Sequence, residues 1–173
     1  MKSLIIYSST DGQTKKICEA IKENFNNKGF VEILPLEDAF HLNINNYDQI
    51  ILGASIRYGN YKSNLFKFIK YNIKILETKK NAFFSVNVVA RKNEKNTPDT
   101  NPYIKKFLKK TSWRPKKIEV FAGKVDYPNY NLFNKLVIRF IMFITKGPTD
   151  ISHSYEFTDW GKVKKFSKEL SNY

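Results

Sequence analysis

The sequence is poor in cysteine, with Cys18 alone among 173 residues. One thiol excludes an intramolecular disulfide and a cysteine-rich metal site, and we expect no bound metal. The first seven residues carry one charge and a very short apolar run, so we also expect no secretory leader. Both absences favour a cytoplasmic protein.

Acidic residues are also scarce. The 16 Asp and Glu residues are outnumbered by 30 Lys and Arg, which leaves a formal net charge of +14. A field of this sign attracts nucleic acid, an anionic membrane or an anionic small molecule. Neither an RNP pattern nor a helix-turn-helix is apparent, so we expect no nucleic-acid partner.

The first polar loop, at residues 8–14, lacks the glycine spacing of the Walker loop and of the dinucleotide fingerprint. It offers hydroxyl groups, a flexible glycine and the backbone N–H groups of a helix N-terminus, which suit a terminal phosphate. The alternative is an ordinary helix cap and turn. The predicted phosphate loop consists of Ser9, Thr10, Asp11, Gly12, Gln13 and Thr14.

Strand and helix patterns alternate along the chain. Apolar runs rich in β-formers occupy residues 4–7, 30–34, 49–52, 82–90 and 118–122. The first helical pattern starts at Thr14, and we expect Gly29 to end this helix. Further helical patterns lie near 66–76, at 102–110 and at 159–170. The alternation predicts one flavodoxin-like α/β domain over residues 1–173, with a doubly wound parallel sheet in the order 2-1-3-4-5. Ligands of such sheets bind beyond the carboxyl ends of the strands.

Two further segments follow strands at the same edge of the predicted sheet, residues 53–59 and 84–88. Flavodoxins flank the isoalloxazine ring with these segments. We expect Arg57 and Tyr58 to cover one side of a flavin, although each feature alone is also typical of ordinary loop packing. The predicted cofactor residues here are Ser55, Ile56, Arg57, Tyr58, Phe84, Ser85, Val86, Asn87 and Val88.

Several longer motifs span nearly the whole chain: Asp11-Gly12-Gln13-Thr14, residues 53–59 and 84–92, Trp113-Arg114-Pro115 and residues 155–160. Together they resemble the menaquinone-dependent protoporphyrinogen IX dehydrogenase family. Most flavodoxins have Thr at the position of Asp11, and the resemblance to this family accounts for the difference. It implies an FMN enzyme of haem biosynthesis that removes six electrons from protoporphyrinogen IX and passes them to menaquinone or ubiquinone. No catalytic acid or base is predicted.

A basic, apolar insert separates the last predicted strand from the last helix, at about residues 124–154. If its centre is helical, Asn131, Lys135, Arg139, Met142 and Lys146 form a narrow stripe and nearly every other position is apolar. The run is too short to span a bilayer, which takes about 20 apolar residues. It suits a helix lying in the interface, at the cytoplasmic face of the cell membrane. The alternative is an extra core element or an oligomer interface.

The substrate that the resemblance implies is an apolar ring carrying propionates. Its predicted cationic anchors are Arg91, Lys92, Lys135 and Arg139. A different class of function is a flavodoxin-type electron carrier without a substrate of its own. Such carriers are typically acidic, whereas residues 101–146 hold eleven Lys and Arg against two acidic residues.

Overall fold

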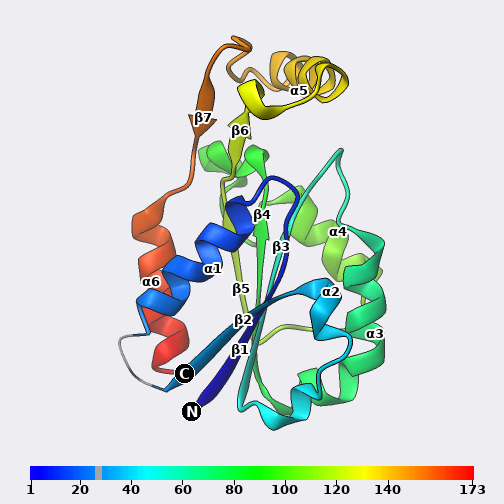
Figure 1. Cartoon of the computed structure of the whole chain (residues 1–173), viewed down its shortest axis with the longest axis vertical. Helices are drawn as coiled ribbons and strands as arrows, with labels where there is room; N and C mark the ends of the chain where they lie inside the picture. Colours follow the sequence, from blue (N-terminus) through cyan, green and yellow to red (C-terminus); the bar gives the residue numbers. More distant parts are fainter. Residues whose placement is uncertain (26–28) are drawn as a thin grey trace.

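The computed structural model describes residues 1–25 and 29–173. Its main sheet is five-stranded and parallel, in the order β2-β1-β3-β4-β5, which confirms the predicted flavodoxin-like topology (Figure 1). The strands are β1 (Lys2–Ser8), β2 (Phe30–Pro35), β3 (Gln49–Ser55), β4 (Lys80–Val86) and β5 (Lys117–Phe121). In the centre, Ile5 of β1 pairs with Ile33 of β2 and Ile51 of β3.

Helices cover both faces of this sheet (Figure 1). On one face lie α1 (Gln13–Glu23) and α6 (Trp160–Ser171); on the other lie α2 (Leu36–Ala39), α3 (Ser63–Thr78) and α4 (Pro102–Lys110). Adjacent strand residues face opposite cores because side chains alternate along a strand. Phe83 therefore packs toward α3 and α4, while Phe84 packs toward α1 and α6. Both faces of the central strands are buried.

Two boundaries differ most from the sequence prediction. Helix α1 ends at Glu23, where the Asn24 side chain donates to the Ala20 carbonyl oxygen and competes with the backbone. Residues 26–28 of the longer helix that was predicted lie outside the described residues. Gly29 serves the entry into β2 instead: its φ is +143°, and a Cβ there would stand 2.2 Å from the Met1 carbonyl oxygen.

The second difference is at the end of β4, which stops at Val86 rather than continuing to residue 90. Asn87 accepts a hydrogen bond from the Ala90 N–H and caps a 3-10 turn, η2 (Val88–Arg91). A further 3-10 turn, η3 (Asn93–Lys95), follows, and η1 (Ile44–Asn46) precedes β3. A side-chain cap thus overrides the β preference of the valines.

The insert stands beyond the carboxyl ends of the sheet (Figure 1). It consists of β6 (Lys124–Asp126), the turn η4 (Tyr127–Asn129), α5 (Leu132–Ile144) and β7 (Ser154–Glu156). Strands β6 and β7 pair antiparallel, as a two-stranded ribbon that carries α5. A small core of Val125, Tyr127 and Met142 holds the ribbon and the helix together.

Candidate functional site

A cavity of about 340 Å³ lies between the carboxyl ends of the strands and the insert. Most residues predicted to bind a cofactor line it, and they come from three separate loops. They are Ser9, Thr10, Asp11, Gln13, Thr14, Ser55, Ile56, Arg57, Tyr58, Val86, Asn87 and Val88. The topology therefore brings together segments that are far apart in the chain.

The predicted phosphate loop forms one end of the cavity. Gly12 has a φ of +83°, a conformation that favours glycine, and its N–H donates to the Ser9 hydroxyl at 3.0 Å. Within the described residues, no side chain caps the N-terminus of α1, and the buried Thr14 hydroxyl has no hydrogen-bond partner. Buried polar groups are normally paired. An unpaired hydroxyl beside an uncapped helix N-terminus fits a phosphate group better than an ordinary helix cap.

The Asp11 carboxylate binds residues outside the predicted phosphate loop. Its Oδ2 accepts a hydrogen bond from Arg57 at 2.7 Å and another from the Tyr130 hydroxyl at 3.1 Å. The Arg57 guanidinium also lies 5.0 Å from the ring centroids of Tyr58 and Tyr130. Burial acts to lower the pKa of Arg57, but the charge of Asp11 together with the contacts of Tyr58 and Tyr130 outweighs it, and the pKa is raised. Arg57 thus neutralises Asp11 beside the predicted phosphate loop.

The end of β4 and the turn after it provide a second wall, with Val86, Asn87 and Val88. The Asn87 side chain is used internally: it donates to the Ser85 hydroxyl at 3.1 Å and accepts from Asn101 at 3.2 Å. Ser85, which also accepts from Tyr61, is fully buried. Three predicted cofactor residues, Gly12, Phe84 and Ser85, do not line the cavity. Phe84 does not line the cavity because side chains alternate along a strand, and its ring packs in the core beside α1 and α6.

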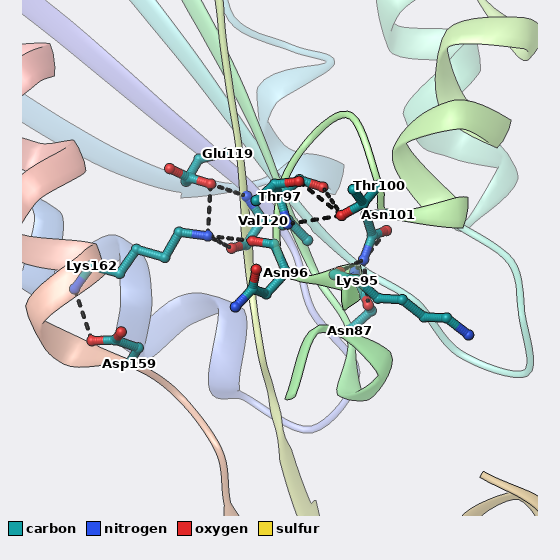
Figure 2. A network of polar contacts seen from close by, with 10 residues as sticks. All are labelled: Asn87, Lys95, Asn96, Thr97, Thr100, Asn101, Glu119, Val120, Asp159 and Lys162. Atoms are coloured by element: carbon teal, nitrogen blue, oxygen red, sulfur yellow. Dashed lines mark hydrogen bonds and ion pairs between the residues drawn. The ribbon is translucent and has the colours of Figure 1, made fainter. Parts of the chain in front are cut away.

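The loop after β4 is held from both sides, as Figure 2 shows. Asn101 donates to the Lys95 carbonyl oxygen at 2.8 Å. From α6, Lys162 donates to the Asn96 carbonyl oxygen at 2.5 Å and pairs with Glu119 at 2.9 Å. Through Asn101, which donates to Asn87, this network is connected to the cavity wall at residues 86–89.

The four predicted substrate anchors lie outside the cavity wall. Arg91 donates to the Val88 carbonyl oxygen at 3.0 Å and to the Thr145 carbonyl oxygen at 2.7 Å, and burial lowers its pKa. It therefore ties the C-terminal end of α5 to the turn after β4. Lys92 and Lys135 are half-buried and Arg139 is exposed.

The apolar wall of the cavity escaped the sequence prediction. It is formed mainly by Val89, Tyr103, Val125, Tyr130, Ile138, Ile141 and Met142, and the further lining residues are Gly59, Gly123 and Lys124. One usable sign was present: Met142 is the apolar member of the otherwise polar helical stripe. In the structure Met142 is buried and Lys135 is half-buried, whereas Asn131, Arg139 and Lys146 are exposed, so only part of the stripe faces the domain.

The opposite face of α5 is exposed and apolar. Leu132 and Phe143 are 73% and 71% exposed, and Phe133, Leu136, Phe140 and Ile144 share this surface. In the described part of the chain, no helix is long and apolar enough to cross a membrane. The helix thus packs on the domain along one side only, which excludes a role as a fully buried core element.

Comparison with known proteins agrees with this geometry. A flavodoxin-domain family model matches residues 4–152. The protoporphyrinogen IX dehydrogenase (quinone) of Escherichia coli K12 is 38% identical over 173 residues, covering 99% of this chain and 96% of the relative. The Leishmania major enzyme of the same name is 39% identical over 172 residues, covering 98% and 74%. This chain belongs to that family.

Solved structures support the same fold. Flavodoxin 1 from Bacillus cereus superposes with a TM-score of 0.60 at 17% identity, over 100% of this chain and 99% of that one. An archaeal flavodoxin gives a TM-score of 0.55, also at 17% identity, over 99% and 97%. These neighbours show the fold, whereas the flavodoxin domain implies a flavin cofactor, and the family is one of oxidoreductases.

Proposed function

We propose that this chain is an FMN-dependent protoporphyrinogen IX dehydrogenase that passes electrons to a membrane quinone, either menaquinone or ubiquinone. The observation that carries the proposal is sequence similarity to enzymes of that name over 98–99% of the chain. The cavity is consistent with it, because a phosphate-type loop at one end meets an apolar wall at the other.

FMN is the flavin that the loop fits best. Its single phosphate needs one helix N-terminus and a few donors, and the uncapped N-terminus of α1 with the Thr14 hydroxyl supplies them. Thr14, Ser9 and the backbone of residues 10–13 would hold the phosphate. Arg57 favours this binding indirectly, since it compensates the charge of Asp11 next to the loop.

The chemistry that a bound flavin supplies is two-electron transfer between porphyrinogen and quinone. The protein contributes position and exclusion of water. Residues 86–88 form one wall, and Ile138 and Met142 of α5 contribute to the apolar side of the chamber. Such a wall suits the flat, apolar rings of a tetrapyrrole and a quinone.

We further propose that the protein binds peripherally to the cytoplasmic face of the cell membrane. Six large apolar side chains face outward from α5, and the net charge of +14 adds attraction to anionic lipid. Arg139 and Lys146 flank this surface and are exposed. A quinone acceptor dissolved in the bilayer requires such proximity.

The test begins with the purified protein and FMN. We expect a flavin spectrum and, without oxygen, conversion of protoporphyrinogen IX to the porphyrin only when FMN and a quinone are both present. A protein that holds FMN but shows no quinone-dependent porphyrin formation is an electron carrier, and that result overturns the proposed reaction. A protein that takes up no FMN overturns the proposed cofactor.

A further inference from the structure

The segment of the insert just before α5 is joined to the predicted phosphate loop through one carboxylate oxygen, while β7 is joined to the same loop by the Gln13 side chain, which donates to Glu156 at 3.0 Å. Asp11 Oδ2 accepts from Arg57, which belongs to the loop after β3, and from Tyr130, which belongs to the insert just before α5. The side chains of Asp11 and Arg57 are 28% and 19% exposed, so solvent screens this pair less than a surface pair. Three segments of the chain therefore meet at one partly buried charge.

A second contact strengthens the same junction. Tyr58 donates to the Asn134 side-chain oxygen in the first turn of α5. Tyr58 itself has a φ of +49°, an unfavourable conformation for a bulky residue, which persists only where the surroundings hold it. The backbone pair Arg57–Asn60, with hydrogen bonds of 3.0 and 3.1 Å, closes a tight turn that holds Tyr58 in this conformation, and the contacts of Tyr58 with Arg57 and Asn134 add to it.

The two ends of α5 are attached differently. Its C-terminal end is fixed by Arg91, which donates to the Thr145 carbonyl oxygen and hydroxyl at 2.7 and 3.1 Å. Its N-terminal end depends on side chains that include one from the predicted phosphate loop. Between the two ends, Ile138 and Met142 close over the cavity. Release of the N-terminal end alone would open the cavity.

We propose that Asp11, Arg57 and Tyr130 form a latch that couples occupancy of the phosphate loop to docking of α5 over the cavity. The latch rests on the proposed function, because the expected occupant of the loop is the FMN phosphate. A phosphate bound to the backbone of residues 10–14 fixes Asp11 and so orders half of the latch. Asp11 is thus a positioning residue for the insert rather than a phosphate ligand.

Thermodynamic linkage makes this coupling reciprocal. If FMN favours docked α5 by some factor, docked α5 favours FMN by the same factor. An undocked helix of 13 residues is also barely stable in water, so its amide hydrogens exchange rapidly. Hydrogen–deuterium exchange over Leu132–Ile144 therefore reports docking without any enzymatic assay.

The test compares Asp11→Asn and Tyr130→Phe with matched controls. Asp38→Asn makes the same charge change at an exposed site, and Tyr71→Phe removes a hydroxyl from a side chain that is 81% exposed on α3. Without flavin, we expect exchange in α5 to be roughly fivefold faster or more in both latch variants, the lower end of typical coupling factors. Exchange in α4 should be unchanged, which shows that the variants fold.

The second arm adds FMN. In the wild-type protein and both controls, FMN should slow hydrogen exchange in α5. In Tyr130→Phe, the ratio of the exchange rates without and with FMN should be smaller than in wild type. The factor of this decrease should equal the factor by which the Kd for FMN rises. Latch variants that exchange like wild type without flavin overturn the latch. FMN that binds wild type but leaves α5 exchange unchanged overturns the coupling. Wild-type protein that binds no FMN overturns the proposed cofactor, and the flavin-free comparison still decides the latch.

Discussion

The sheet and the insert use apolar side chains in opposite ways. In the sheet, Phe83 and Phe84 are fully buried, one in each core. In α5, Phe140 and Phe143 are exposed, and Met142 is the buried member of the helix. Exposed apolar patches of this kind mark interaction surfaces in soluble domains. The comparison shows that hydrophobic residues stabilise one region and are available for binding in the other.

The sharpest contrast is expected between two phenylalanines. Phe83 stacks on Phe107 with ring centroids 3.9 Å apart, so Phe83→Ala should lower the free energy of unfolding by about 3–5 kcal/mol. Phe140→Ala should change it by less than about 0.5 kcal/mol, because the side chain is exposed. Urea denaturation measures both. Similar losses in the two variants would mean that α5 is covered in solution.

The two sides of the cavity also differ: the predicted phosphate loop of the domain is polar, whereas the wall formed by the insert is apolar. Thr14→Val should weaken FMN binding by roughly thirtyfold, about 2 kcal/mol, because a hydrogen bond to a charged phosphate is lost. Stability without flavin should hardly change, since the described residues offer this hydroxyl no partner. Thr14→Ser keeps the hydroxyl and serves as the control in a flavin fluorescence titration. Unaltered affinity of Thr14→Val would exclude Thr14 from the phosphate site.

Vesicle binding tests the exposed side of the comparison. Phe140→Ala should reduce binding to anionic vesicles by roughly tenfold, at the lower end of what burying such a side chain contributes, about 1.5 kcal/mol. The same change at Tyr71, which is exposed on α3, should have no effect. Co-sedimentation with vesicles at two salt concentrations measures both variants. Equal binding by wild type and Phe140→Ala would remove α5 from the membrane contact.

The smallest effect concerns pH at the junction of the two regions. Burial raises the pKa of Tyr130 to about 12, and the nearby Asp11 adds to the rise. A raised pKa means that the folded state holds the proton more tightly. The associated stability is therefore present below the ordinary tyrosine pKa, near 10, and is lost as the pH approaches 12.

Tyr130→Phe should remove the pH-dependent stability that the Tyr130 hydroxyl contributes. The difference in urea midpoint between wild type and Tyr130→Phe should shrink steadily from pH 9.5 to 11.5, while Tyr71→Phe should track wild type throughout. A constant difference over this range would mean that the Tyr130 hydroxyl is not held in a buried junction.

Most of the fold was predictable because its determinants are local. Helix α4 matches its predicted bounds, since Asn101 accepts from the N–H groups of Tyr103 and Ile104 and Pro102 starts the helix. The order of the strands follows from the alternation of strands and helices. The early end of β4 was not predictable, because a valine-rich run reads as strand and only the Asn87 side chain turns it.

The site was predictable where motifs mark it and not where distant segments meet. The loops after β1 and β3 reach the cavity as expected. The partners of Asp11 lie 46 and 119 residues away, and no local pattern reveals that its carboxylate is directed to Arg57 and Tyr130. Arg91 carries the charge of a substrate anchor, but it holds the end of α5. Those roles depend on tertiary contacts.

The proposed reaction is tested most directly by following porphyrin formation from protoporphyrinogen IX without oxygen, with FMN-loaded protein, anionic vesicles and either menaquinone or ubiquinone. The account predicts porphyrin formation in proportion to the quinone reduced, slowed in Phe140→Ala by its weaker vesicle binding. Porphyrin formation that is independent of quinone, or none at all from a fully FMN-loaded protein, would contradict it.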